Sequence, residues 1–202
     1  MPPWCSSELP RDIETRCYNQ KIIIKNFITE TLFKEYQFAG YPIQYIVGCK
    51  ATQGSETTEW AGSVTLLGLL PLWRATLPPD TVLAVRPPTP ADCWPFRGSY
   101  GEIIIELPKL IQVDAVSVEH VRPDTARSAP KHFKIFGVLN NGTWVTGASG
   151  TYTYNKPHKQ YFILNINKLV KQIIFRVLSN QGNNKYTCMY RVHLYTKYIN
   201  EV

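Results

Sequence analysis

The side chains best suited to chemistry in this 202-residue chain are four histidines and five cysteines. Glu119 and His120 are adjacent at the end of a strand-like run and could act as an acid and base pair. A histidine in such a place more often makes a hydrogen bond at a loop. The sequence has no G-x-S-x-G turn for a nucleophile and no glycine-rich loop that opens a helix to hold a phosphate. We therefore expect a protein that is not an enzyme.

Cys93 and Cys188 are the cysteines with a physical case for pairing. Cys93 ends a Pro-rich loop and Cys188 lies in a strand-like run, so the two could meet across a sheet. A bridge closing a loop of about 95 residues would remove about 4.7 kcal/mol of unfolded-chain entropy in the simplest model. The alternative is that both are reduced core cysteines. The cysteines form no C-x-x-C and the histidines show no zinc-ligand spacing, so we expect no such metal site.

The positive charge of the chain does not indicate a nucleic-acid partner. Lys and Arg number 22 against 15 for Asp and Glu, which gives a net charge of +7. These residues are scattered, and neither a basic block nor an RNA-binding aromatic signature is present. We therefore expect no binding to nucleic acid.

The elements that must position the candidate residues are mostly strands. Short apolar or alternating runs separated by turn residues cover 43–49, 82–85, 102–107, 113–120, 133–138, 143–146, 161–166, 173–178 and 187–195. This spacing predicts an antiparallel β-sandwich over 41–202. One face of the last run carries Tyr186, Cys188, Tyr190, Val192 and Leu194, and the other carries Met189, Arg191, His193 and Tyr195. One face is expected in the core and the other at solvent or a partner.

Residues 1–40 form a separate N-terminal region. Residues 1–10 are rich in Pro and Ser and are expected to be loose, without the basic and apolar regions of a signal peptide. From Asp12 to about Tyr36, apolar residues recur at helical spacing. The predicted helix either packs on its own domain or forms a short coiled-coil stem that joins identical chains.

Residues 64–73 are the most apolar stretch, at about half of the ~20 residues needed to cross a bilayer. They follow the polar, turn-prone residues 54–59. Such a segment is most often core, yet Gly68 and Pro71 also suit a protruding flap whose edge accepts another strand. Further along, Asn140-Asn141-Gly142 predicts a hairpin turn, and Asn141 begins a glycosylation sequon that matters only in a luminal or secreted chain.

Several motifs in register resemble the SUN domain. They are Cys93-Trp94-x-Phe96-x-Gly98-x-x-Gly101, Val118-Glu119-His120-Val121, Ser128-Ala129-Pro130-Lys131-x-Phe133-x-Ile135-x-Gly137, Asn180-x-Gly182, and Tyr186-Thr187-Cys188-Met189-Tyr190-Arg191-Val192. Upstream, Ser55-Glu56-Thr57, Leu66-Leu67 and Pro71-Leu72-Trp73 continue the resemblance, which covers roughly residues 43–195.

The resemblance implies a galactose-binding-like sandwich that forms a homotrimer on its helical stem. Such domains lie in the perinuclear space at the inner nuclear membrane and bind the C-terminal peptide of a KASH protein. The two proteins form the LINC complex between nucleus and cytoskeleton. Membrane association would come from a segment absent here or from partners.

The resemblance also assigns site residues. The peptide carboxylate would be bound by His120, Ser128, Tyr186 and Tyr190, whose hydroxyl and N–H groups suit an acceptor-only anion. Residues 55–77 would form a KASH lid that adds the peptide as a strand, including Ser55, Glu56, Thr57, Leu66, Leu67, Leu69, Leu70, Pro71, Leu72 and Trp73. Cys93 and Cys188 match the family disulfide. A structural monovalent cation such as K⁺ would be held by backbone carbonyls near Val82, Val85, Asp92 and Tyr190.

Two positions depart from the family pattern. Several members have a cysteine that forms a disulfide with the KASH peptide, and this chain has Gly54 in that place. The family also has an aromatic residue before the glycine of Asn-x-Gly, and this chain has Gln181 there. A covalent link to the peptide is therefore not expected through position 54. The alternative function is a carbohydrate-binding module, which would need exposed aromatic rings beside carboxylates at a loop rim.

Overall fold

The computed structural model describes residues 43–60, 63–66, 70–73, 76–121, 127–153 and 156–197. Residues 63–66 and 70–73 are described at the level of the backbone. The predicted N-terminal helix and stem, residues 1–40, lie outside the described residues. No helix in the described part of the chain is long and apolar enough to span a bilayer.

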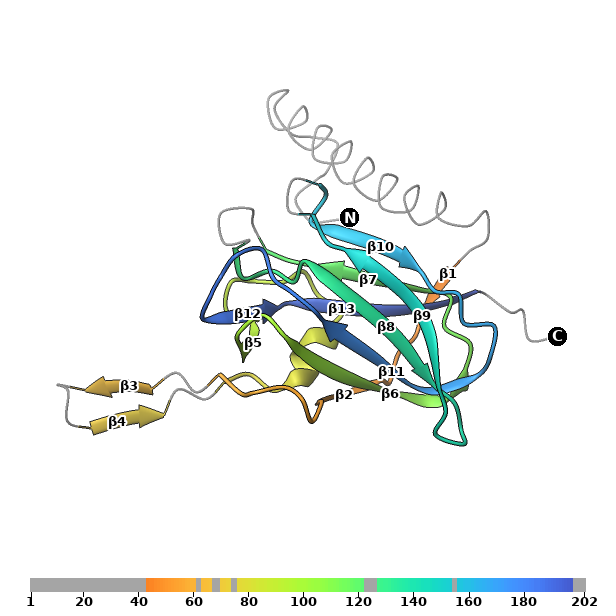
Figure 1. Ribbon diagram of the computed structural model, residues 1–202, viewed down its shortest axis with the longest axis horizontal. Coiled ribbons are helices and arrows are strands. Elements are labelled where there is room, and N and C mark those ends of the chain that lie inside the picture. Colours follow the sequence, from red (N-terminus) through yellow and green to blue (C-terminus); the bar gives the residue numbers. More distant parts are fainter. Residues whose placement is uncertain are drawn as a thin grey trace, which may run out of the picture. The chain divides into compact units, whose positions relative to one another are not determined.

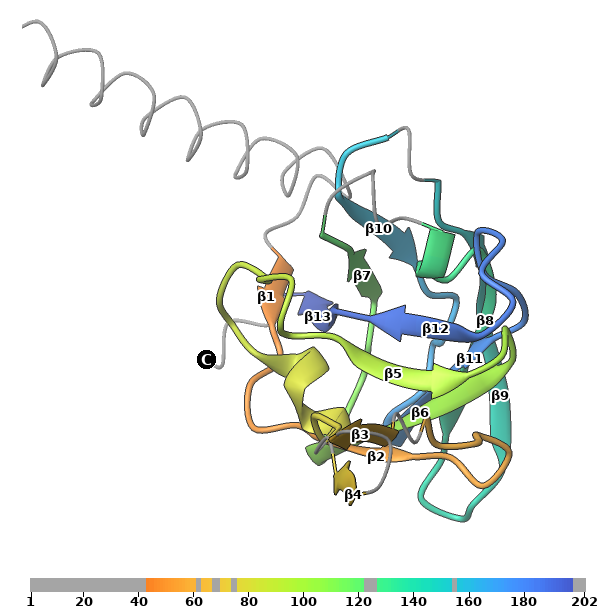
Figure 2. The same cartoon turned by 90° about the vertical axis from the view of Figure 1, so that its left-hand side faces the viewer.

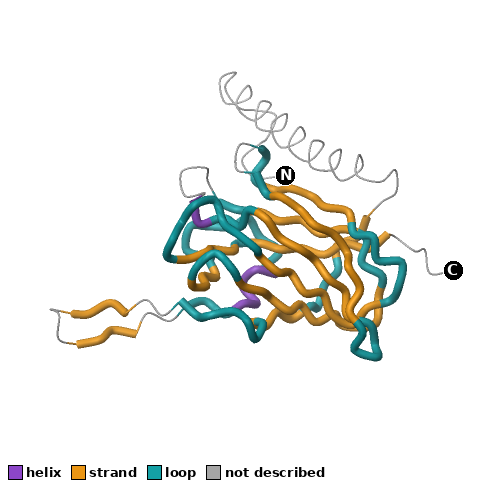
Figure 3. Tube along the Cα trace, viewed as in Figure 1, coloured by secondary structure: helices purple, strands orange, loops and turns teal. Residues whose placement is uncertain are grey.

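Two sheets form the layers of a sandwich (Figures 1 and 2). The larger sheet has the order β2-β6-β11-β8-β9 and the smaller has the order β1-β13-β7-β10. The larger contains β2 (Lys50–Gln53), β6 (Gly101–Ile111), β8 (His132–Val138), β9 (Trp144–Thr151) and β11 (Val170–Val177). The smaller contains β1 (Ile43–Tyr45), β7 (Ala115–Glu119), β10 (Lys159–Ile163) and β13 (Arg191–Lys197). The predicted β-sandwich is confirmed, and Figure 3 shows how few helical turns interrupt the strands.

The core lies between these two layers because alternate residues of each strand point inward. The larger sheet contributes the fully buried Ile103, Ile105, Phe133, Ile135, Ile173, Phe175 and Val177. The smaller contributes Val116, Val118, Val192 and Leu194. In the larger sheet Phe175 lies opposite Ile103 on one side and Ile135 on the other. The position of each strand is therefore fixed by which residues must be buried.

Two further pairs of strands extend the fold. Strand β5 (Trp94–Arg97) pairs with β12 (Tyr186–Met189), and β3 (Ser63–Leu66) pairs with β4 (Leu70–Trp73). Within the described residues, β3 and β4 pair with no other strand. The apolar stretch 64–73, for which the sequence left open the core and a protruding flap, thus contributes to a separate two-stranded sheet. Leu67 and Leu69, predicted as lid residues, lie outside the described residues.

Several sequence-based boundaries were wrong. The predicted strand 82–85 is instead the 3-10 helix η1 (Pro79–Leu83), where a proline stands at the first helical position and Val82 alone is buried. Strands β2 and β5 were not predicted. The predicted strand 187–195 is interrupted at Tyr190, which separates β12 from β13. The turn before β9 is confirmed, since Leu139 N donates to Thr143 O and Gly142 adopts a φ of 84°.

The expectation of one exposed face in the C-terminal run was also wrong. Met189, Arg191, His193 and Tyr195 are all buried, with 1–7% of their surface exposed. The reason is that the loop around η1 covers this face. His193 Nε2 donates to Ala84 O at 3.1 Å, and Arg191 Nη1 donates to Thr81 O at 3.1 Å. Alternation identifies two faces, but it cannot show that a distant loop covers the polar one.

Candidate functional site

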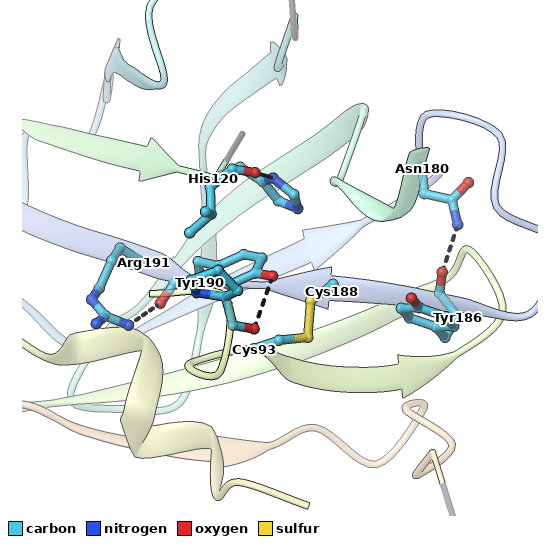
Figure 4. The surroundings of a disulfide bond; sticks show 9 residues. Cys93, His120, Asn180, Tyr186, Cys188, Tyr190 and Arg191 are labelled. Atoms are coloured by element: carbon cyan, nitrogen blue, oxygen red, sulfur yellow. Dashed lines mark hydrogen bonds between the residues drawn. A yellow bond between two sulfur atoms is a disulfide. The ribbon is translucent and has the colours of Figure 1, made fainter. Parts of the chain in front are cut away.

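A disulfide between Cys93 and Cys188 joins β5 to β12 beside the candidate site (Figure 4). The two Cα atoms are 5.6 Å apart, and Cys188 lies opposite Pro95 in the register of the two strands. The alternative of two reduced core cysteines is therefore excluded in this structure. The bridge fixes the strand that leads directly into Tyr190.

His120 lies just past the end of β7 with 3% of its surface exposed. Its ring meets the ring of Tyr190 edge to face, with centroids 4.6 Å apart (Figure 4). Nδ1 is 2.6 Å from the Val121 carbonyl, which can only accept, so Nδ1 carries the proton. Burial lowers the pKa of His120 to about 4 and keeps the ring neutral at pH 7.

The other ring nitrogen of His120, Nε2, is a buried polar atom that could bind a ligand. Nε2 is buried and has no hydrogen-bond partner in the described part of the chain. Because the ring is neutral with its proton on Nδ1, Nε2 presents a lone pair. A buried unpaired polar atom costs free energy, so such atoms in folded proteins call for an explanation. A ligand group that donates a hydrogen bond would supply one.

Tyr190 occupies the break between β12 and β13. Its hydroxyl donates to Pro90 O over a long 3.4 Å, and 6% of the residue is exposed. Burial, with smaller effects from Tyr186 and Asp92, raises the pKa of this phenol, so it stays protonated at neutral pH. The hydroxyl is therefore a donor whose present bond is weak enough to be exchanged for a charged acceptor.

Ser128 and Tyr186 are linked through a segment that the sequence did not identify as part of the site. Ser128 is buried in residues 127–130, which run beside 180–183: Gln181 N donates to Ala129 O and Asn183 N to Arg127 O. The Asn180 amide then donates to Tyr186 O at 3.3 Å and to Thr187 Oγ1 at 3.1 Å. Asn180 therefore connects the serine loop to β12. The sequence feature that could have identified Asn180 is the motif Asn180-x-Gly182. The glycine of this motif has a φ of 110°, which favours glycine over other residues.

The predicted lid divides into an anchored base and a hairpin. Thr57 is buried, and its hydroxyl donates to Glu102 O and accepts from Glu102 N. Glu56 accepts from the Tyr100 hydroxyl at 2.7 Å, and Trp60 meets the Tyr186 ring with centroids 5.1 Å apart. Residues 55–60 are therefore part of the sandwich, and the β3–β4 hairpin follows them in the chain.

Both departures from the family pattern have local explanations. A Cβ at Gly54 would collide with the Glu102 side chain, so a cysteine does not fit here without moving that residue. Gln181, in the place of the family's aromatic residue, makes a hydrogen bond instead: its Nε2 donates to Tyr152 O at 2.6 Å. Tyr152 in turn donates to His158 O, which also accepts from His120 N.

An ion-pair network lies behind Tyr190 and was not predicted. Arg191 has no exposed side-chain surface and Asp92 has 7%, and Arg191 Nη2 is 2.8 Å from Asp92 Oδ2. Arg86 binds the same carboxylate through both terminal nitrogens, at 2.7 and 2.6 Å. The Arg86 guanidinium, together with Thr89 and Arg191, holds the pKa of Asp92 well below its usual range. Arg191 also donates to Arg86 O and Tyr190 O, at 3.1 and 2.7 Å.

The fold and the motifs define a β-sandwich of the SUN type. Residues 72–198 match the model of the Sad1/UNC-like C-terminal family, and the chain belongs to that family. It is 32% identical over 155 residues to SUN domain-containing protein 2 of Mus musculus, covering 72% of this chain and 21% of that protein. It is 30% identical over 128 residues to sperm-associated antigen 4 protein of Homo sapiens, covering 59% of this chain and 29% of that protein. The chain thus spans less than a third of these relatives.

Solved structures support the fold at low sequence identity. An F5/8 type C domain from Bacteroides fragilis aligns with a TM-score of 0.54 at 13% identity, covering 78% of this chain and 98% of that one. A family 32 carbohydrate-binding module from Clostridium perfringens, solved with GalNAc-β-1,3-galactose, aligns with a TM-score of 0.53 at 10% identity, covering 73% and 95%. This likeness concerns the sandwich alone.

Proposed function

We propose that this chain binds the C-terminal peptide of a KASH partner at the site formed by His120, Ser128, Tyr186 and Tyr190. The observation that carries the proposal is the buried His120–Tyr190 pair. Among the described residues, Nε2 of His120 has no hydrogen-bond partner, and the Tyr190 hydroxyl makes only a long hydrogen bond. A site with such groups gains more from a polar ligand than a satisfied core would. Its place beside the disulfide of a SUN-family chain supports the assignment.

The protonation states of the site residues decide which of them donate and which accept hydrogen bonds. A carboxylate only accepts hydrogen bonds, so the hydroxyls of Ser128, Tyr186 and Tyr190 are its donors. Neutral His120, with its lone pair at Nε2, instead accepts from an N–H or hydroxyl of the terminal residue. Neutral hydroxyl donors form stronger hydrogen bonds to a charged carboxylate than to a neutral acceptor, so the site should prefer a peptide with a free terminal carboxylate. A peptide extended by one residue would place a neutral amide there and lose the charge-assisted bonds.

The β3–β4 hairpin supplies the second part of the interaction. Its strands pair only with each other among the described residues, so each has a free edge. An extended peptide can add to such an edge through main-chain hydrogen bonds. The anchored base at Thr57 and Trp60 keeps this hairpin connected to the carboxylate site.

In the cell, such binding would make the chain part of a LINC complex at the nuclear envelope. The relatives named SUN domain-containing proteins support this role, in which a homotrimer in the perinuclear space holds KASH tails. A luminal location would also make Asn141 a glycosylation site. It lies in an exposed turn, where its Oδ1 accepts from Thr143 N at 3.0 Å.

A monovalent cation in the η1 loop is a separate proposal. The carbonyl of Tyr190 accepts one hydrogen bond from Arg191 and keeps a second lone pair. The Asp92 carboxylate already binds Arg86 and Arg191. The ion would therefore have to be held by neutral backbone carbonyls near Val82, Val85, Asp92 and Tyr190, beside the positive guanidinium of Arg191. The donor set fits a weakly held ion such as K⁺. Melting temperatures in potassium and in tetramethylammonium chloride at equal ionic strength test this.

The deciding experiment is calorimetric titration with a KASH-type C-terminal peptide, the same peptide extended by one residue, and the peptide as a C-terminal amide. Binding of the free acid alone is the expected result. Light scattering on the same sample tests the trimer. Equal binding of all three peptides would rule out carboxylate recognition, and no binding by the folded chain would overturn the proposed function.

A second candidate, carbohydrate binding, has one observation in its favour. Tyr100 is 40% exposed, and its hydroxyl donates to the exposed Glu56 carboxylate. This is the aromatic and carboxylate pairing that sugar sites use. A glycan array probed with the wild-type chain and with Tyr100→Ala tests it, since a sugar site there would lose its signal in the variant while peptide binding persists.

A further inference from the structure

Tyr190 contacts a loop, residues 89–92, whose turn is closed by the carboxylate and backbone N–H of Asp92. Asp92 accepts from Thr89 N at 2.9 Å, and its own N–H donates to Thr89 O, which closes residues 89–92 into a turn. Pro90, whose carbonyl accepts the Tyr190 hydroxyl, lies inside that turn. The position of the phenol therefore depends on where Asp92 holds the loop.

Asp92 is in turn fixed to the chain beside Tyr190. Arg191, the next residue, binds Asp92 with a fully buried guanidinium and also donates to the carbonyls of Thr81, Arg86 and Tyr190. A planar guanidinium with several fixed acceptors has one allowed orientation. The neighbouring residue Cys93 is tied to Cys188 by the disulfide. Both ends of the Tyr190 segment are thus connected to the same turn.

Arg86 completes the network from the surface. It binds both Asp92 oxygens, while 55% of its side chain is exposed. The bidentate geometry fixes the plane of the carboxylate, which an isolated contact to Arg191 would leave free to rotate. Among the described residues no hydrogen bond joins Arg86 to Tyr190, and the path of hydrogen bonds from Arg86 to the phenol runs through Asp92 and the turn.

We propose that Arg86, Asp92 and Arg191 form a positioning network that aims the Tyr190 hydroxyl at the ligand carboxylate. This inference rests on the proposed function, because it concerns the geometry of the same site. Arg86 is then a positioning residue on the surface that controls the selectivity of a site formed by buried residues.

The test compares affinities for the free-acid and amide forms of the KASH-type peptide. Arg86→Gln should reduce the acid-over-amide preference about tenfold, the scale of one misaligned hydrogen bond to a charge, and Arg86→Lys should restore part of it. Lys134→Gln, at an exposed cation on β8 that lies opposite Arg176 and Ser149, should leave the preference unchanged. In a Tyr190→Phe background Arg86→Gln should have no further effect, since both changes act on one hydroxyl.

The outcomes separate the two proposals. If the wild-type chain binds neither form, the proposed function fails. If it prefers the acid and Arg86→Gln keeps that preference, the positioning network is wrong and the function stands. If Arg86→Gln lowers the affinity for acid and amide equally, the residue stabilises the fold only, and the inference is again overturned.

Discussion

The indole of Trp60 contacts the ring of Tyr186, with centroids 5.1 Å apart and planes inclined by 44°. Trp60 lies at the base of the hairpin segment, and Tyr186 begins β12 two residues before the disulfide. This contact joins the two parts of the proposed peptide site, the segment that leads into the β3–β4 hairpin and the carboxylate-binding residues, through a pair of aromatic side chains.

Removal of that contact should weaken peptide binding without unfolding the sandwich. Trp60→Ala is expected to reduce the binding free energy by about 1 kcal/mol, the scale of an aromatic pair. Calorimetry measures it. Trp144→Ala is the matched control, because that indole is 48% exposed on β9 and packs against Phe136 instead. Equal losses in both variants would show a general effect of truncating tryptophan.

Tyr190→Phe should weaken binding by about 1–3 kcal/mol, because one donor to a desolvated charge is lost. Among the described residues the Tyr190 hydroxyl makes one hydrogen bond, to Pro90 O at 3.4 Å, so stability should change little. Titration with the free-acid peptide, together with a urea unfolding curve, gives both quantities. Unchanged affinity would show that Tyr190 serves only the core.

Replacing residues 63–73 with a glycine–serine linker should abolish binding and leave the sandwich folded. The hairpin pairs with no other described strand, whereas Thr57 is buried in the sandwich and must be retained. Circular dichroism and calorimetry on the replaced chain test this. A chain that no longer folds would return the apolar segment to the core interpretation.

The paired change Cys93→Ala and Cys188→Ala should lower the free energy of unfolding by at most about 4.7 kcal/mol, the loop-closure value for a loop of this size. The bridge spans 95 residues of sequence, and residual structure in the unfolded chain reduces the measured cost. Urea denaturation of the variant is compared with that of the parent. Cys49→Ala, at a cysteine that forms no disulfide among the described residues, is the control.

Stability should fall as the pH is lowered from about 6.5 to about 4. Burial lowers the pKa values of His120 and His193 to about 4 in the folded chain, against 6.5 for an ordinary histidine. Between these values the unfolded chain binds more protons, so acid favours unfolding, and above about 6.5 the effect is constant. Urea titrations across this range measure it. His193→Gln should flatten the profile, and an unaltered profile would contradict the assignment.

The sandwich and the disulfide could be predicted because each rests on local or pairwise information. The short apolar and alternating runs predicted most of the strands, and the motifs around Cys93 and Cys188, which resemble the SUN domain, implied the bridge. The η1 helix was mistaken for a strand because the four residues 82–85 are all apolar, and nothing local shows that only Val82 of the helix is buried. Short strands such as β2 and β5 carry too few residues to display a period.

The network around Arg191 could not be predicted for a different reason. Asp92, Arg86 and Arg191 are brought together across about 100 residues of sequence, and charged residues are usually expected at the surface. The protonation of His120 likewise depends on a backbone carbonyl of the next residue. Sequence identifies which side chains can do chemistry, and three-dimensional packing decides which atoms remain available.

The disulfide also has a mechanical consequence. A peptide anchored at Tyr190 and pulled from outside would load the junction between β12 and β13. The covalent bond from Cys188 to Cys93 passes that tension directly into β5 and so into a second, distant part of the backbone. While the bridge is intact, β12 and β5 therefore stay joined at the end that lies next to Tyr190.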